Sequence, residues 1–237
     1  MVERRREVDG APTSLCDLGF CDVGLDDAWQ ACGSGNAGLH YHLVEADGTA
    51  RPVVDTGRFP DMRHMTDHAH RLGLTAGWYG NNCLCMEAEE VSAAVYAGDV
   101  LAAVGYGFDG IKLDNCGSQL DLELWAKLFN ESGKPMMIEN CHWGQTVPAG
   151  DHCPWNLFRT SGDIRASYGS MVGNLLTTVH WAKTGYSRPG CWAYPDMSEV
   201  GNWDPSPTRY DEEQAHWGLW AIVSSPMVLG FDMSDGK

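Results

Sequence analysis

The chain has 237 residues, a length that fits one large domain such as an α/β barrel. Its 16 basic and 32 acidic residues give a net charge of −16, which repels nucleic acid phosphates and anionic lipid surfaces. The sequence also lacks an apolar run of the roughly 18 residues that a membrane-spanning helix needs. We therefore expect no nucleic acid partner and no membrane insertion.

Nine cysteines are many for a cytosolic enzyme and predict an oxidising compartment with several disulfides and one unpaired thiol. The first ten residues carry charge, but no apolar segment follows them. No signal peptide is therefore visible in this chain.

Short apolar runs alternate with longer helical patterns. Strands are expected at residues 20–25, 74–79, 110–113, 136–138, 157–159, 190–192 and 227–230. Between them, helical apolar stripes begin at Met62, Val91 and Leu120, and a last helix is expected around Trp217. No Gly-rich phosphate loop follows the first strand, so the alternation favours a (β/α)8 TIM barrel over an open doubly wound sheet. An eighth strand is not apparent.

Polar side chains follow six successive strands of this pattern. In a parallel barrel such side chains converge on one mouth. A single Asp in such a turn is usually a helix cap or an ion-pair partner, but recurrence at six strand ends favours a functional site. The residues are Asp26 and Asp27, Tyr79, Lys112 and Asp114, His142, Arg159 with Asp163, and Asp196.

Two of these carboxyl groups suit glycosidic cleavage, which needs an ionised nucleophile and a protonated acid about 5 to 5.5 Å apart in retaining enzymes. Lys112 and Asp114 are two residues apart on a strand, so both point into the barrel, and the ammonium favours the charged carboxylate. Asp163 follows Gly162 on a turn that can bring its carboxyl to a leaving-group oxygen. A purely structural salt bridge between Lys112 and Asp114 is the alternative.

Seven segments resemble, in order, glycoside hydrolase family 27, which contains α-galactosidases and α-N-acetylgalactosaminidases. The resemblance implies that residues 15–237 form a partial (β/α)8 catalytic barrel, with residues 1–14 unassigned. The segments are Leu25-Asp26-Asp27-Ala28-Trp29, Arg58-Phe59-Pro60, Leu72-Gly73-Leu74, Lys112-Leu113-Asp114-Asn115-Cys116, Arg159-Thr160-Ser161-Gly162-Asp163-Ile164, Pro195-Asp196-Met197 and Leu219-Trp220-Ala221-Ile222.

The resemblance implies a retaining exo-glycosidase that removes terminal α-linked galactose from oligosaccharides, glycolipids or glycoproteins, without cofactor or metal. Asp114 would attack the anomeric carbon, while Asp163 protonates the departing oxygen and then activates water. The expected sugar-binding residues are Asp26 and Asp27 at the 4- and 6-hydroxyls, Lys112 at the 3- and 4-hydroxyls, Arg159 and Asp196 on the 2-hydroxyl side, His142, and Tyr79 lining the pocket.

The resemblance also implies disulfides between Cys116 and either Cys83 or Cys85, and between Cys141 and Cys153. Asn130 begins a glycosylation sequon where family members carry one. The family implies a secreted, lysosomal or vacuolar location and allows a homodimer.

The chain departs from the family pattern at several places. His142, in Cys141-His142-Trp143, replaces an acidic residue that helps read the 2-substituent, which leaves an α-N-acetylgalactosaminidase as an alternative. Ala28 replaces a cysteine, and Ala193-Tyr194 replaces Asn-Asp before Pro195. The barrel's first strand and the C-terminal β-sandwich are not recognisable, so an inactive sugar-binding fragment is a further alternative.

Two alternatives come from other classes of protein. A zinc protein would use Cys83, Cys85, Cys116, Cys141 with His142, and Cys153, with His64 and His68 on a helix. Cys-x-Cys is a poor match to the usual zinc spacing, so disulfides and surface histidines are favoured. A Schiff-base aldolase using Lys112 is disfavoured, because Asp114 would keep that lysine protonated.

Overall fold

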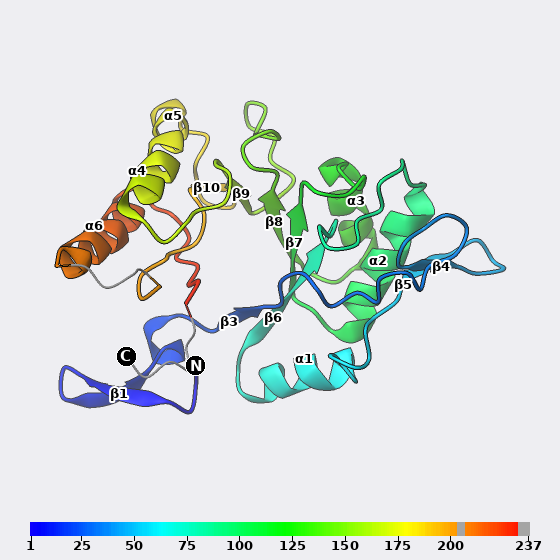
Figure 1. Cartoon of the computed structure of the whole chain (residues 1–237), viewed down its shortest axis with the longest axis horizontal. Coiled ribbons are helices and arrows are strands. Elements are labelled where there is room, and N and C mark those ends of the chain that lie inside the picture. The colour runs from blue at the N-terminus through cyan, green and yellow to red at the C-terminus, as the bar shows by residue number, and fades with distance from the viewer. Residues whose placement is uncertain (203–206, 232–237) are drawn as a thin grey trace. The chain divides into compact units, whose positions relative to one another are not determined.

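The structure is a computed structural model that describes residues 1–202 and 207–231. The chain divides into two compact units, Met1–Ile138 and Glu139–Lys237 (Figure 1). No helix among the described residues is long and apolar enough to cross a membrane.

The first unit is built on parallel strands in the order β3 (Asp22–Gly24), β6 (Thr75–Gly80) and β7 (Gly110–Asp114). The start of β8 (Met137–Cys141) continues this order, since Met137 N donates to the Asp109 carbonyl at 3.0 Å. The connecting helices are α1 (Met62–Arg71), α2 (Ala93–Tyr106) and α3 (Leu122–Ser132). This is the strand and helix alternation that the sequence predicts.

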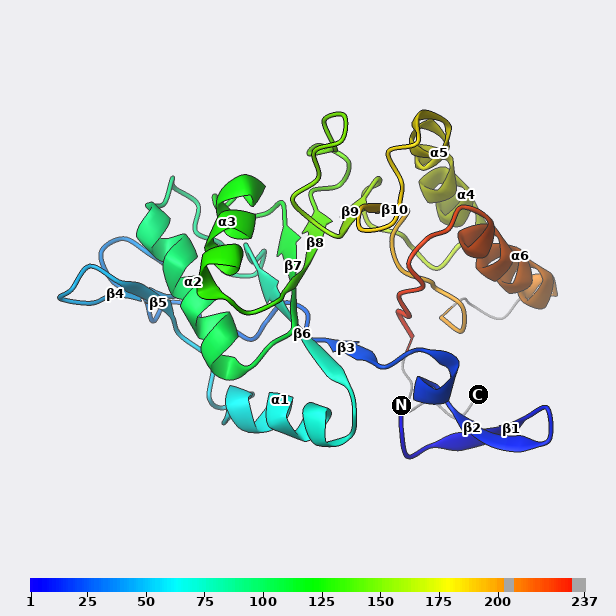
Figure 2. The ribbon, with the colours of Figure 1, turned by 180° about the vertical axis from the view of Figure 1, so that it is seen from behind.

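Local sequence signals set the ends of these helices. The side chain of Asp61 accepts from His64 N and begins α1, and Asp121 accepts from Leu124 N and begins α3. Gly107 ends α2 with a left-handed φ of 86°, a conformation that glycine adopts without strain. Helices α2 and α3 lie side by side in both ribbon views (Figures 1 and 2).

An aromatic cluster forms the core of the first unit. The Trp78 ring stacks on Phe108 with centroids 5.3 Å apart and packs at a tilt against Trp29 with centroids 4.4 Å apart. Trp29 also donates from Nε1 to the Tyr79 carbonyl at 2.9 Å, and its ring meets Tyr41 edge-on. Each such ring pair contributes about 0.5 to 1.5 kcal/mol beyond area burial. The cluster therefore fixes the loop after β3 against the end of β6.

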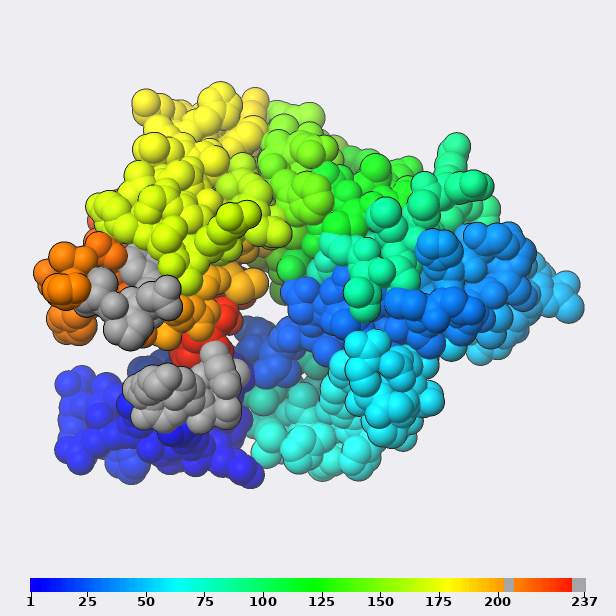
Figure 3. Space-filling view, viewed as in Figure 1, coloured from blue at the N-terminus to red at the C-terminus, as the bar shows by residue number. Residues whose placement is uncertain are grey.

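Two hairpins that the sequence did not predict complete the first unit. Strands β4 (His42–Val44) and β5 (Ala50–Pro52) pair antiparallel and form part of the unit's surface (Figure 3). A Cβ at Gly98 of α2 would lie 1.3 Å from the Ala50 carbonyl oxygen, so only glycine permits this contact between hairpin and helix. Residues 1–14, unassigned from sequence, contain the hairpin of β1 (Arg5–Val8) and β2 (Ala11–Ser14), followed by the 3-10 helix η1 (Cys16–Leu18).

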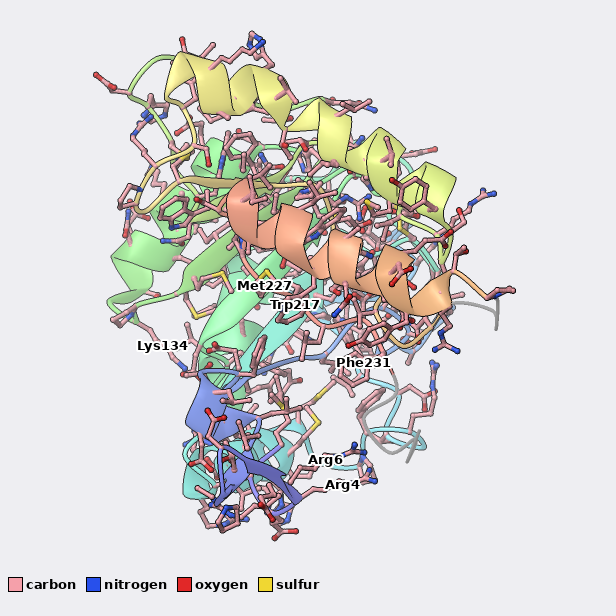
Figure 4. All side chains as sticks on the ribbon, turned by 90° about the vertical axis from the view of Figure 1, so that its left-hand side faces the viewer. Arg4, Arg6, Lys134, Trp217, Met227 and Phe231 are labelled. Atoms are coloured by element: carbon pink, nitrogen blue, oxygen red, sulfur yellow. A yellow bond between two sulfur atoms is a disulfide. The ribbon has the colours of Figure 1, made fainter. Side chains whose placement is uncertain are left out.

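The second unit has parallel strands in the order β8, β9 (Leu157–Arg159) and β10 (Trp192–Tyr194). Its helices are α4 (Tyr168–Thr177), α5 (Val179–Thr184) and α6 (Arg209–Ile222). Ile164, Met171 and Trp220 form its buried cluster, against which Met227 packs (Figure 4).

The parallel α/β class and six of the seven predicted strands are confirmed. The strand predicted at residues 227–230 is wrong, because Leu229 forms only a single parallel bridge, to Ser198. Val228 N donates to the Pro226 carbonyl, which makes a turn and leaves little extended chain for pairing.

Four disulfides join cysteines of the described residues: Cys16–Cys21, Cys32–Cys85, Cys83–Cys116 and Cys153–Cys191. Of the two partners left open for Cys116, Cys83 is therefore the one used.

The predicted Cys141–Cys153 bond is wrong. Cys153 precedes β9 and lies with its Cα 6.2 Å from that of Cys191, just before β10, whereas Cys141 is buried on β8 and interacts with Arg159.

Candidate active site

The first unit brings four of the predicted site residues together at the ends of its parallel strands. Lys112 and Asp114 lie two residues apart on β7, and Tyr79 lies near the end of β6. Lys112 Nζ is 2.8 Å from Asp26 Oδ2 and 5.1 Å from the centre of the Tyr79 ring. The ammonium is therefore held by a carboxylate and an aromatic face rather than presented as a free amine.

The Asp114 carboxylate is buried and held by two donors. Tyr79 Oη donates to Oδ2 at 2.6 Å, and Asn115 N donates to Oδ1 at 2.7 Å. Burial and the hydrogen bond to Asp114 raise the pKa of Tyr79 well above its ordinary value, so the phenol keeps its proton as a donor. The side chain of Asn81 donates to the Asp114 carbonyl and holds the backbone.

The Cys83–Cys116 disulfide borders this carboxylate. Cys116 Sγ lies 3.6 Å from Asp114 Oδ1, and Cys83 Sγ lies 3.3 Å from Tyr79 Oη. These two sulfurs and the carboxylate form the one group of potential metal ligands among the described residues. Because the sulfurs are bonded to each other, they are not thiolates that could bind zinc.

Two other cysteines of the zinc alternative are also in disulfides and cannot bind zinc as thiolates. Cys85 is bonded to Cys32, and Cys153 is bonded to Cys191.

The neighbouring residues Asp26 and Asp27 have different surroundings. Asp27 Oδ1 accepts from Ala28 N and Gln30 Nε2, and Oδ2 accepts from Cys83 N and Leu84 N, all within 2.9 Å. The Asp26 side chain is 61% exposed and reaches Lys112. Asp27 therefore joins the loops after β3 and β6, while Asp26 faces solvent.

In the second unit, Arg159 organises the predicted residues. Its guanidinium is buried and lies 2.5 Å from Asp163 Oδ1 and 3.3 Å from Asp196 Oδ2. Its Nε donates to the Ser161 carbonyl. Burial opposes the charge, but interactions with Cys141 and Asp196 outweigh that effect and raise the pKa of Arg159 above its usual value.

The two carboxylates on Arg159 differ in exposure. The Asp163 side chain is 80% exposed, whereas that of Asp196 is buried. Asp196 has a left-handed φ of 95°, and its Oδ2 accepts from Ile164 N while its carbonyl accepts from Trp220 Nε1. Such a strained residue persists only where surrounding contacts fix it, as they do here. The Asp163 carboxyl group is thus accessible to solvent, whereas the Asp196 carboxyl group is buried and held in place.

His142 is buried beside the end of β8. Its Nδ1 shares a hydrogen bond of 2.8 Å with Thr146 Oγ1, and its backbone N donates to the Asn140 side chain. These contacts hold the loop that follows β8.

The sequence pattern did not indicate three residues near the site. Tyr194, at the end of β10, donates from its hydroxyl to Glu139 of β8. Asn81, two residues after Tyr79, holds the Asp114 backbone. Glu139 and Cys141 are two residues apart on β8 and therefore share one face of the strand. That spacing was the sequence signal that could have placed Glu139 near the site.

The sequence profile of the family described as alpha galactosidase A matches residues 13–236. An alpha-galactosidase of Oryza sativa subsp. japonica is 29% identical over 234 residues, and alpha-galactosidase 2 of Arabidopsis thaliana is 28% identical over 234 residues. These alignments cover 93% of the chain but 51% and 54% of the relatives. The chain spans about half the length of the curated relatives it matches.

Solved structures show the same fold at low identity. A protein of Bacteroides fragilis assigned as an alpha-galactosidase/melibiase superposes with a TM-score of 0.70 at 23% identity, over 91% of this chain and 48% of that one. A GH27 β-L-arabinopyranosidase of Geobacillus stearothermophilus superposes with a TM-score of 0.67 at 18% identity, over 91% and 64%.

Proposed function

The chain belongs to the alpha galactosidase A family, and we propose that it acts as a retaining exo-glycosidase that removes terminal α-linked galactose from oligosaccharides, glycolipids or glycoproteins. One observation carries this proposal: the buried Asp114 carboxylate at the end of a parallel strand is held by Asn115 and by Tyr79, whose ring centre lies 5.1 Å from the Lys112 ammonium. A carboxylate fixed in place at a strand end suits the nucleophile of a retaining glycosidase.

Asp114 is the proposed nucleophile and Asp163 the proposed acid and base. An oxygen of Asp114 bonds to the anomeric carbon as the glycosidic bond breaks, and Asp163 gives its proton to the departing oxygen. Asp163 then takes a proton from water, whose oxygen displaces Asp114 and releases the sugar with retained configuration. The Asp163 side chain is 80% exposed, so a leaving group and water can reach it, which supports this role.

The remaining predicted residues divide into three groups. Asp26, with its exposed carboxylate, and Lys112 are proposed to bind sugar hydroxyls, and Arg159 with Asp196 to bind on the 2-hydroxyl side. Asp27 and His142 already bond to neighbouring protein groups, which supports a role in holding the loops rather than the sugar. Tyr79 is proposed to orient Asp114.

We further propose that the parallel strands are part of a (β/α)8 barrel and that the protein works in a secreted or vacuolar compartment. Four disulfides among the described residues support an oxidising compartment. Asn130 is exposed near the end of α3, which agrees with its proposed glycosylation.

The experiment compares 4-nitrophenyl α-galactoside, α-N-acetylgalactosaminide and β-L-arabinopyranoside as substrates. The last sugar has the ring stereochemistry of galactose without its hydroxymethyl group, and a structural relative acts on that class. We expect α-galactoside to be preferred, and Asp114→Asn to lower kcat/KM at least about a thousandfold. Asp67→Asn, on the exposed face of α1, is the matched control and should retain activity.

Proton NMR of the first product gives the stereochemistry, because α-galactose must appear before its β anomer. A folded chain that hydrolyses none of the three glycosides contradicts the proposed function. Release of β-galactose first contradicts the nucleophilic role of Asp114.

A further inference from the structure

His42 is a fully buried histidine that the proposed mechanism does not use. It is the first residue of β4, and both of its ring nitrogens face carboxylates. Nδ1 lies 2.9 Å from Glu87 Oε1, in the loop after β6, and Nε2 lies 3.0 Å from Asp99 Oδ1, on α2. The ring therefore joins three separate segments of the first unit.

The geometry favours a protonated ring. A neutral imidazole has one donor and one acceptor nitrogen, so it would direct a lone pair at one of the carboxylates, whereas an imidazolium donates to both. Burial opposes this charge, but Asp99 and Glu87 outweigh it and raise the pKa of His42 to about 9. Glu87 also accepts from His40 N and Tyr41 N, which fixes the chain that leads into β4.

A chain of hydrogen bonds runs from this triad to the proposed nucleophile. Asp99 Oδ2 accepts from Gln119 Nε2 at 2.6 Å, and Gln119 N donates to Asn81 Oδ1 at 3.0 Å. Asn81 Nδ2 in turn donates to the Asp114 carbonyl. On the other side, the Glu87 carbonyl accepts from Ser118 N at 2.9 Å, so both carboxylate residues reach the loop after β7.

The residues of this hydrogen-bond chain are closely packed. A Cβ at Gly117 would lie 2.4 Å from Asn81 Oδ1, and Asn81 itself has a left-handed φ of 55°. Displacement of Gln119 must therefore move Asn81, which contacts both Gly117 and the Asp114 backbone.

We propose that His42, held between Glu87 and Asp99, is a positioning residue that sets the place of Asp114 through Gln119 and Asn81. Its catalytic consequence rests on the proposed glycosidase function, but the coupling itself does not require substrate. Small displacements of a reacting group cost up to about a hundredfold in rate. The hydrogen bonds from His42 to Asp114 can therefore affect kcat without any contact between His42 and the sugar.

The other groups around His42 do not account for the coupling. The Tyr41 ring packs on the imidazole with centroids 4.2 Å apart, and burial and Asp99 raise its pKa well above the usual value. Tyr41 Oη accepts from Asn82, and His40 contacts Glu87 through its backbone. Tyr41 therefore stays neutral up to pH 10 and does not account for a change of charge beside His42.

The test follows the amide signals of the full ¹⁵N-labelled chain by NMR from pH 6 to 10, without substrate. We expect both His42 ring N–H protons to be visible below pH 9, and the Asn81 and Gln119 amide shifts to titrate together with His42. In Asp99→Asn, the new amide can donate to a neutral ring and still accept from Gln119, so the fold should persist while this shared titration disappears.

Kinetics then separate positioning from simple stability. His42→Gln should lower kcat about tenfold or more on 4-nitrophenyl α-galactoside while KM changes less than about threefold. His70→Gln is the matched control, because His70 pairs with Asp109 at 2.8 Å outside this chain of bonds. It should change neither kcat nor the Asn81 shift.

Two results would overturn the inference. One is titration of His42 near its ordinary pKa, and the other is an Asn81 amide shift that stays constant in the wild type while His42 titrates. Wild-type inactivity with the coupled titration intact would instead count against the proposed function alone. If His42→Gln does not fold, the wild-type and Asp99→Asn titrations still decide the question.

Discussion

At the residue scale, two neighbouring aspartates of the first unit, Asp26 and Asp27, have different roles. Asp27 turns both carboxylate oxygens to the protein and accepts four hydrogen bonds, whereas Asp26 reaches outward to Lys112. Sequence reasoning placed both residues at the site but could not separate them, because the donors to Asp27 include backbone N–H groups 56 and 57 residues away. The role of a carboxylate depends on which donors the fold brings to it.

Tyr79 offers a direct test at this scale. Tyr79→Phe removes the hydrogen bond to Asp114 Oδ2 and leaves the ring in place. Because a charge-assisted hydrogen bond both stabilises and orients a carboxylate, we expect kcat on 4-nitrophenyl α-galactoside to fall about tenfold to a hundredfold with little change in Tm. Tyr210→Phe on α6, where the tyrosine is exposed, is the control. An unchanged kcat in Tyr79→Phe would show that Asn115 alone is sufficient to orient Asp114.

At the element scale, the β4–β5 hairpin determines how α2 can be placed. Gly98→Ala puts a methyl group 1.3 Å from the Ala50 carbonyl oxygen, a backbone atom that no rotamer change can move. We expect it to lower the free energy of unfolding by about 3 kcal/mol, the upper part of the usual range for overpacking. Urea unfolding followed by circular dichroism measures this.

Gly105 provides the matched control on the same helix. A Cβ there meets no atom within 4 Å, so Gly105→Ala should raise stability by about 0.5 to 1 kcal/mol through helix propensity. Equal effects at the two glycines would mean that the hairpin does not rest on α2 as described.

The elements also show which parts of the fold a sequence can predict. Strands β6 and β7 and helices α1 to α3 follow apolar periodicity and flanking caps, which are local signals, and they were predicted within a few residues. The β4–β5 hairpin has strands of three residues each and is held by His42 and Gly98 through contacts distant in sequence. The wrong Cys141–Cys153 pairing has the same origin, since only the order of β8, β9 and β10 shows that Cys191 lies near Cys153.

At the scale of the whole molecule, the excess of acidic residues carries over into buried positions. Glu87 and Asp99 are both buried, and His42 is the cation placed between them. An uncompensated buried carboxylate pair would be costly, so the charge of one histidine makes this part of the fold dependent on pH.

The stability of the chain should therefore fall on the alkaline side. The folded pKa of His42, about 9, lies above its ordinary value of 6.5, so its contribution is complete below pH 6.5 and is lost as pH rises toward 9. A difference of this size corresponds to about 3 kcal/mol at most. Urea unfolding at pH 6 and pH 9.5 measures the loss, and Asp99→Asn, which tolerates a neutral ring, should show a much smaller one. If the wild type is equally stable at both pH values, the histidine cannot be carrying a proton between the two carboxylates.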